Sequence, residues 1–152
     1  MNNELKIDNL FSEMYIEASK GSCLYRKYSA AIVKGTKVVS IGYAQNIDGS
    51  KCNSCKRFEK IKKHGNISEF FEDCSVIHAE AGAILNCNKK SDLIGGDLYL
   101  LGVNSTDGSI YSDAFPCNNC LKIIQYVGIK HICVFQSNKE IISYEVTNDI
   151  KY

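Results

Sequence analysis

The chain has 152 residues, a formal net charge of +1, and a composition that is 45% hydrophobic and 23% charged. These values are typical of one globular domain, and they exclude a disordered, collagen-like or low-complexity chain. The near-neutral charge makes nucleic acid an improbable partner, because such proteins hold the phosphate backbone by positive charge. The unusual feature is the cysteine count of eight, beside one proline and no tryptophan.

Eight cysteines suit either a secreted protein with disulfides or a metal-binding protein in a reducing compartment. The first ten residues include acidic side chains and lack the apolar core of a signal peptide. No stretch reaches the ~18 consecutive apolar residues of a membrane span. We therefore expect a cytoplasmic protein without a membrane segment, in which metal binding is the better explanation of the cysteines.

The first half of the chain predicts one helix and one hairpin. Apolar residues recur at helical spacing from Ile7 to Ala18, with Gly21 as a stop signal. Two β-rich runs at residues 30–33 and 38–41 flank a glycine turn, which is typical of a β-hairpin.

Regular patterns fade between residues 44 and 74. A basic run at residues 56–63 is either a solvated surface or a patch that faces a phosphate or nucleotide. We expect a short helix within residues 67–74.

The second half alternates helices and strands. We expect helices over residues 76–86, beginning near His78, and from Pro116 onward, and strands over residues 97–101, 131–135 and 141–146. This alternation implies crossovers and a partly parallel sheet covered by helices. The sequence therefore predicts one α/β domain over residues 1–152.

Two short motifs carry the chemistry, His78-Ala79-Glu80 and Pro116-Cys117-Asn118-Asn119-Cys120. Cys117 and Cys120 lie on one helix face, and two thiolates with one imidazole leave the fourth zinc position open for water, as in catalytic sites. Glu80 is better placed to carry protons than to bind the metal. The H-x-E and P-C-x-x-C pair matches the signature of zinc deaminases, in which water attacks an amine-bearing ring carbon. The alternative is a purely structural zinc site.

From about Ser22 to Phe135 the chain resembles the cytidine and deoxycytidylate deaminase family, most closely the deoxycytidylate (dCMP) branch. The landmarks are Ser22-Cys23, the hairpin SAAIVKGTKVVSIGY, Cys55-Lys56-Arg57, the run Cys74 to Glu80, the Pro116–Cys120 motif and the stretch 128–132. The resemblance implies a three-layer α/β/α sandwich around a mixed five-stranded sheet. It also implies hydrolytic deamination, with His78, Cys117 and Cys120 on zinc and Glu80 as the proton shuttle.

Six cysteines remain outside this motif. Cys87 and Cys133 lie in apolar segments and are expected to be buried thiols. The other four lie in the first half of the chain, where some dCMP deaminases carry a second, structural zinc, and four thiolates can close such a site. We therefore expect either no second zinc or one held by Cys23, Cys52, Cys55 and Cys74, with His64 as a substitute ligand.

Departures from the family pattern bear on the substrate. After His-Ala-Glu the dCMP branch continues x-Asn-Ala-Ile, whereas this chain has Ala81-Gly82-Ala83-Ile84. The loop after the hairpin, residues 42–49, lacks the family's proline, and Asp48 stands where a basic residue is common. An acid there would repel a phosphate. Asn46 is either a substrate contact or an exposed loop residue.

The segment 102–114 is longer than a minimal connection to the Pro116–Cys120 motif. It is either a plain solvent loop or a pocket wall that brings Tyr111, Asp113 or Phe115 to the substrate. With Ala79 and Asn46, these residues are the candidate substrate contacts.

Three functions are therefore open. The first is deamination of a free cytosine-type nucleotide, dCMP above all; the second is deamination of a free purine or of a base in RNA. The third is a non-catalytic, zinc-braced binding module. The resemblance also implies a homo-oligomer.

Overall fold

The computed structural model describes residues 4–67 and 69–150. Along the chain it contains α1 (Ile7–Ser19), β1 (Arg26–Lys34), β2 (Lys37–Tyr43), β3 (Gln45–Asn46), α2 (Lys56–His64), the 3₁₀ turn η1 (Phe71–Asp73), β4 (Val76–Ile77), α3 (Ala79–Asn86), the 3₁₀ turn η2 (Lys90–Asp92), β5 (Asp97–Asn104), α4 (Asn118–Tyr126), β6 (His131–Phe135) and β7 (Ile141–Glu145). Apart from the helix expected within residues 67–74, the regular elements predicted from the sequence are present, with longer strands at β1, β2 and β5.

Five strands form one sheet in the order β2-β1-β5-β6-β7. Strands β5 and β6 run parallel, because α4 crosses over between them, and the other neighbouring pairs are antiparallel. β3 and β4 pair separately as a short antiparallel ladder. The expectation of a mixed five-stranded α/β sheet is confirmed.

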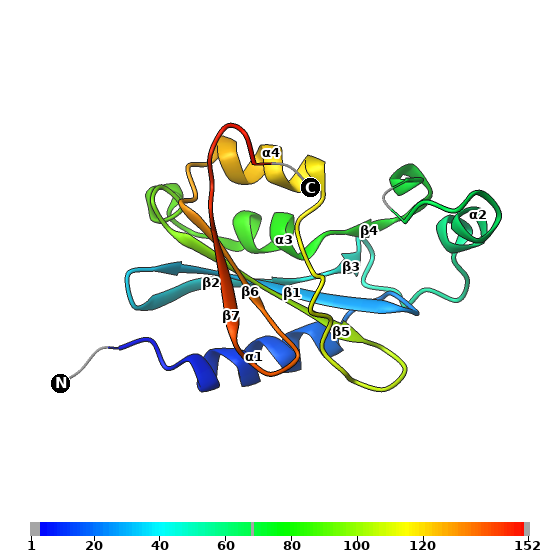
Figure 1. Ribbon diagram of the computed structural model, residues 1–152, viewed down its shortest axis with the longest axis horizontal. Helices are drawn as coiled ribbons and strands as arrows, with labels where there is room; N and C mark the ends of the chain where they lie inside the picture. Colours follow the sequence, from blue (N-terminus) through cyan, green and yellow to red (C-terminus); the bar gives the residue numbers. More distant parts are fainter. Residues whose placement is uncertain (1–3, 68, 151–152) are drawn as a thin grey trace.

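Helices cover the two faces of this sheet (Figure 1). Helix α1 lies on one face, where Leu10 and Met14 pack among sheet residues that include Phe135. Helices α3 and α4 lie on the other face, where Ala83 and Ile124 join a second buried cluster. Each face of the sheet thus has its own apolar core, which gives the three-layer α/β/α arrangement.

Helix α3 lies unusually close to β2 because Gly42 has no side chain. A Cβ atom built on Gly42 would lie 2.3 Å from the backbone nitrogen of Ala83. The hydroxyl of Ser40 donates to the carbonyl of Ala83 at 2.7 Å and fixes the same approach. The start of α3, which carries the His-Ala-Glu motif, is held firmly against the sheet as a result.

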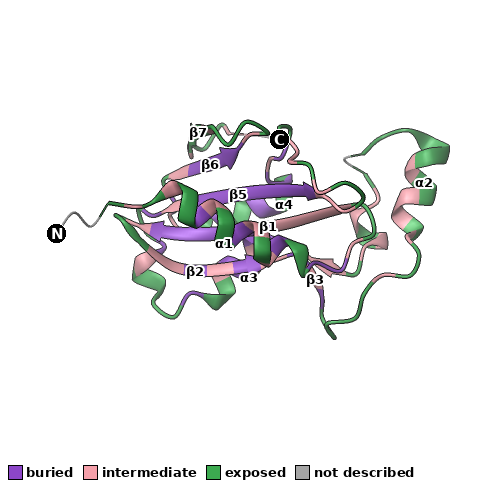
Figure 2. Ribbon diagram, turned by 90° about the horizontal axis from the view of Figure 1, so that it is seen from below, coloured by how far each residue is buried: buried purple, intermediate pink, exposed green. Residues whose placement is uncertain are grey.

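The region of residues 44–77 differs most from the sequence-based expectation. The basic run forms α2, which stands off the sandwich and has no buried residue (Figure 2). It had no apolar stripe to predict it; instead the Cys55 sulfur caps its start, and Gly65, with φ 84°, ends it. The helix expected within residues 67–74 was wrong apart from the 3₁₀ turn η1.

The helix expected to begin near His78 is confirmed, since α3 begins at Ala79. Residues 76 and 77 before it form the short strand β4. Among residues 4–67 and 69–150, no helix is both long and apolar enough to cross a membrane.

Candidate metal centre and active-site cavity

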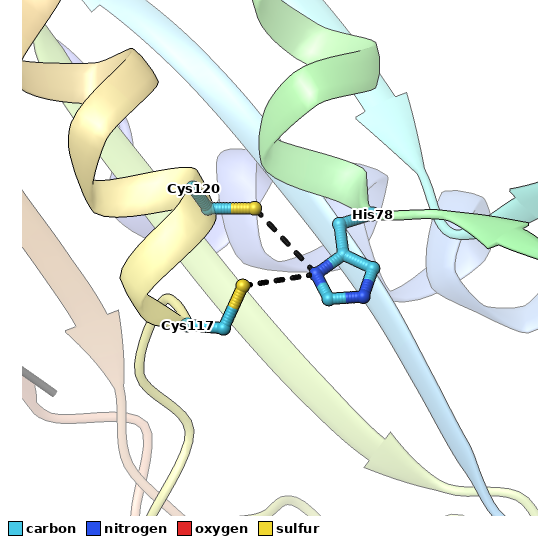
Figure 3. Close-up of side chains that lie close together, drawn as sticks. All are labelled: His78, Cys117 and Cys120. Atoms are coloured by element: carbon cyan, nitrogen blue, oxygen red, sulfur yellow. Dashed lines mark hydrogen bonds between the residues drawn. The ribbon is translucent and has the colours of Figure 1, made fainter. Parts of the chain in front are cut away.

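The imidazole of His78 faces the two thiols of the Pro116–Cys120 motif (Figure 3). Its Nδ1 atom lies 3.5 Å from the Sγ of Cys117 and 3.5 Å from the Sγ of Cys120. All three donor atoms lie within 4.8 Å of one another. One imidazole nitrogen and two thiol sulfurs form a donor set that fits zinc and leaves a fourth position for another ligand.

Two helix starts bring these donors together. His78 is the residue before α3 and Cys117 the residue before α4, and both have extended backbones. Cys120 follows one turn into α4. Because the free N–H groups of a helix start carry partial positive charge, two such starts favour ionised sulfur at this point. The non-helical backbone at position 78 also explains how His78 and Glu80, two residues apart, reach the same site.

The thiols are electrostatically coupled to each other and to the imidazole. The interactions with Cys120 and with His78 together lower the pKa of Cys117 to about 4, although burial opposes them. The same contact with Cys117 raises the pKa of Cys120. Proximity to Cys117 also raises the pKa of His78. The cluster therefore holds thiolate character near neutral pH, as a zinc site requires.

Glu80 lies in the first turn of α3 and is only 6% exposed. Burial raises the pKa of its carboxyl group, and the positive charge of His78 offsets part of this effect. A buried carboxyl beside a metal-type donor set is an unusual placement for a residue without a chemical role.

His78, Glu80 and Cys117 all line one cavity of about 230 Å³. Its walls are mainly apolar and aromatic and come from α2, the start of β1, the segment before α3 and the segment before α4. The lining includes Tyr25, Tyr28, Ala44, Phe58, Phe71, Val76, Ala79 and Phe115. Such a cavity suits a flat ring with few polar groups.

Of the predicted substrate contacts, Ala79 and Phe115 line this cavity. Tyr111 and Asp113 contact Arg26, which does line it: the Arg26 guanidinium lies 4.1 Å over the Tyr111 ring, and its Nη1 lies 3.5 Å from the Asp113 Oδ1. The segment 102–114 therefore contributes to the site through Arg26, and Phe115 directly after it contributes to the cavity wall.

The loop of residues 42–49 gives a different outcome. Asn46 is 8% exposed, so the exposed-loop alternative is wrong. Its amide donates to the Ser50 carbonyl at 2.9 Å and accepts from the Ser75 hydroxyl at 2.7 Å. Asp48 accepts from the Ser50 N–H at 3.0 Å, and hydrogen bonding to the side chain and the backbone of Ser50 lowers the pKa of its carboxyl. Both side chains are engaged in holding the loop.

The four cysteines of the first half are only partly gathered. Cys23, Cys55 and Cys74 line the same cavity, whereas the Cys52 sulfur accepts from the Asn46 amide at 3.6 Å. Within the described ranges, 4–67 and 69–150, His78, Cys117 and Cys120 form the single set of three such donors within 4.8 Å. His64 is exposed at the end of α2, near the Phe70 ring. Cys87 and Cys133 are buried thiols, as expected.

The sequence had assigned no role in the site to three further cavity residues, although Arg57 belongs to the Cys55–Arg57 landmark. Phe71 presents its ring to His78, with the ring centroids 5.7 Å apart, and Arg57 stacks on Phe71 at 4.3 Å. Tyr28 places its hydroxyl 3.2 Å from the Arg26 Nη1. Burial raises the pKa of Tyr28, and the bond from Arg26 offsets part of this rise. The one available signal was that Arg26 and Arg57 are the two arginines of the chain.

Comparison with known proteins agrees with this geometry. A family model described as the cytidine and deoxycytidylate deaminase zinc-binding region matches residues 5–136. The deoxycytidylate deaminase of Mycobacterium phage D29 is 29% identical over 118 residues, 76% of this chain and 82% of the phage protein. That of Schizosaccharomyces pombe is 26% identical over 132 residues, 82% of this chain but 35% of the yeast protein. A probable deoxycytidylate deaminase of Drosophila melanogaster is 28% identical over 82% of this chain and 56% of its own length.

The chain thus spans about a third and just over half of the yeast and fly relatives. Among solved structures, dCMP deaminase from the cyanophage S-TIM5 superposes with a TM-score of 0.56 at 20% identity, covering 86% of this chain and 82% of that one. A second structure of that protein, in complex with dCMP and dUMP, gives a TM-score of 0.53 at 19% identity, over 84% and 78% of the two chains. These likenesses show the fold.

Proposed function

Because the chain belongs to the cytidine and deoxycytidylate deaminase family, we propose that it hydrolyses the exocyclic amine of a cytosine-type nucleotide, converting dCMP to dUMP and ammonia. The observation that carries the proposal is that His78 and Cys117, which form a close donor set with Cys120, line one cavity together with the buried Glu80. We treat residues 1–152 as a single zinc-dependent deaminase domain.

We assign His78, Cys117 and Cys120 as the zinc ligands, with Nδ1 as the His78 donor because it faces both sulfurs. When bound there, zinc supplies a water molecule whose pKa is lowered towards ~7. The chain's own contribution is the fixed donor triangle, set by the two helix starts. The ring of Phe71 supports the His78 imidazole from the side.

Glu80 is the proposed proton carrier. A carboxyl whose pKa is raised by burial can accept one proton from the attacking water and pass it to the ring nitrogen, and then pass a second proton, from the hydroxyl added to the ring carbon, to the leaving amine. Its position in the first turn of α3, two residues from His78, keeps it beside the reacting atoms without making it a ligand. The apolar walls exclude other water from the same space.

The base is proposed to lie between Ala79 and Phe115, which belong to the two segments that also hold the metal donors. The backbone at the start of α3 then offers N–H groups to the base edge. The ring of Phe115 offers an apolar face to the pyrimidine.

We also propose a second, structural zinc held by Cys23, Cys52, Cys55 and Cys74. Two of these sulfurs accept backbone N–H groups, from Tyr25 to Cys23 at 3.4 Å and from Phe58 to Cys55 at 3.3 Å. These bonds fix the orientation of two sulfurs, and four cysteine sulfurs can close a tetrahedral structural zinc site. Metal binding would draw the four sulfurs closer together than they lie in the structure.

A homo-oligomer is proposed as the working assembly. Large apolar side chains are exposed on α3, on α4 and before β5: Leu85, Ile94, Ile123 and Tyr126. Light scattering on the purified protein tests this proposal, and a mass of one chain at micromolar concentration would contradict it.

The test of the activity is ammonia release from dCMP, deoxycytidine, cytidine and cytosine by purified, zinc-loaded protein. We expect release from dCMP and a loss of about 10³-fold or more in Glu80→Gln with zinc retained, since proton transfer and water positioning are removed together. Glu13→Gln, an exposed change on α1, is the matched control. Turnover by Glu80→Gln near the wild-type rate would refute the role of Glu80.

The alternatives have separate readouts in the same preparation. Release from a free purine, or from RNA with salt-dependent binding in a gel shift, would change the substrate class. No release from any of these compounds, together with weak binding of a hydrated-ring nucleoside, would identify a non-catalytic module.

A further inference from the structure

Arg26 stands on the cavity wall at the start of β1, apart from the metal donors. We propose that Arg26 selects an anionic substrate by binding the phosphate of the nucleotide, and that Asp113 occupies the phosphate position until the substrate displaces it. This inference rests on the proposed function, because it names the substrate class of the same site.

Arg26 is the arginine of this cavity whose donors are available. The second one, Arg57, donates from Nε to the Glu69 carbonyl at 3.0 Å and from Nη2 to the Ile67 carbonyl. Its guanidinium also stacks on Phe71. Arg57 is therefore engaged in holding the segment between α2 and η1.

The contacts of Arg26 within the described part of the chain leave part of its guanidinium unused. Nη1 donates to the Tyr28 hydroxyl at 3.2 Å and meets the Asp113 carboxylate at 3.5 Å. The plane rests on the Tyr111 ring. Nε and Nη2 have no partner in the described residues. A guanidinium presents five N–H donors in a fork that matches two phosphate oxygens, so this arrangement suits a phosphate.

The Asp113 carboxylate can be displaced from Arg26 by a phosphate. Its side chain is 68% exposed, whereas that of Arg26 is 31% exposed. An ion pair with one exposed partner at 3.5 Å is weak, and a bidentate phosphate contact is stronger. Displacing Asp113 therefore costs little. Its carboxylate then remains in solvent, where it carries no desolvation penalty.

The position of Arg26 is fixed from the sheet side. Tyr28 lies opposite Gly102 across β1 and β5, and a Cβ atom on Gly102 would lie 2.7 Å from the Tyr28 Cε1. The absent side chain lets the Tyr28 ring lie over β5 and present its hydroxyl to Arg26. Tyr28 and Tyr111 thus hold the guanidinium from two sides in the substrate-free protein.

The experiment compares kcat/KM for dCMP with kcat/KM for deoxycytidine, which differ by the phosphate. We expect Arg26→Gln to lower the ratio of the two by about 10- to 100-fold, the range for a lost charge-assisted contact, and Arg26→Lys to restore part of it. Asp113→Asn should raise the ratio by about 2- to 5-fold, because its pairing is weak. Lys37→Gln, which removes one exposed positive charge in the β1–β2 turn, should leave the ratio unchanged.

Equal losses for both substrates in Arg26→Gln would indicate a merely structural residue and overturn the proposal. Calorimetric binding of dUMP and deoxyuridine tests the same point without turnover. We expect wild-type protein to bind dUMP more tightly and Arg26→Gln to lose that difference. If the protein binds both equally, the proposal fails even where deamination is observed. If it prefers dUMP but releases no ammonia, only the proposed activity fails.

Discussion

Two groups of candidate metal ligands differ in how closely the fold brings their donor atoms together. The donors His78, Cys117 and Cys120 lie within 4.8 Å of one another at the starts of α3 and α4. The second group, Cys23, Cys52, Cys55 and Cys74, lies in loops and at the cap of α2, outside the sandwich core. Helices docked on a sheet position ligands by apolar packing, whereas loop ligands depend on the metal for their final arrangement.

We expect the largest effect from removing one ligand of the group formed by His78, Cys117 and Cys120. Cys117→Ser should lower kcat for dCMP by about 10³-fold and reduce the zinc content by one per chain, because a hydroxyl is a poor replacement for a thiolate ligand. Metal analysis and steady-state kinetics measure both quantities. Cys87→Ser, at a buried thiol whose bond to the Lys89 carbonyl serine can also make, is the matched control. Full zinc content in Cys117→Ser would contradict the ligand assignment.

A change far from the donors tests whether packing assembles them. Gly42→Ala places a methyl group against the backbone of α3 and should lower the free energy of unfolding by about 3 kcal/mol. Because α3 carries His78, zinc affinity should fall as well. Chemical denaturation and zinc competition measure the two effects. Gly35→Ala alters an exposed turn with nothing within 4 Å, and should leave zinc affinity unchanged.

The loop group is tested by Cys74→Ser. Zinc content should fall by one per chain, and amide exchange in α2 should speed up by roughly tenfold, since this helix has no buried residue to hold it. The zinc at His78 should remain. Unchanged zinc content would show that the second group binds no metal in the folded protein.

The smallest effect concerns the cost of burying Glu80. Burial raises the pKa of this carboxyl in the folded protein, so ionisation opposes folding above the unfolded pKa of about 4.5. In metal-free protein, Glu80→Gln should therefore raise the free energy of unfolding at pH 7. Below pH ~4.5 the carboxyl is protonated in both states and the gain should vanish. A gain that persists at pH 4 would point to packing instead of charge.

The sequence alone was sufficient for elements with strong periodicity or a short-range motif. The apolar stripe of α1, the glycine turn of the hairpin and the two zinc-type motifs predicted their structures, and the type and spacing of the motif residues indicated that His78, Cys117 and Cys120 would meet. Each of these signals lies within a short run of neighbouring residues.

What escaped prediction depends on contacts between distant segments. Helix α2 has no apolar stripe, and the sequence analysis did not predict it. Tyr28 reaches its position through Gly102, and Phe71 supports His78 across a turn without regular structure. The buried setting of Asn46 comes from Ser50 and Ser75. None of these pairs leaves a periodic or motif signature in one sequence.

The placement of the donors has a mechanical consequence. His78 and Cys117 are 39 residues apart in the chain, and the segment between them includes α3 and the central strand β5. An ion held by both is a cross-link that closes this stretch into a loop. By the chain-entropy argument used for disulfides, a closed loop of this length restricts the unfolded chain by about 4 kcal/mol. The residues proposed to hold the catalytic zinc would thus also cross-link the chain around the central strand β5 for as long as the ion is bound.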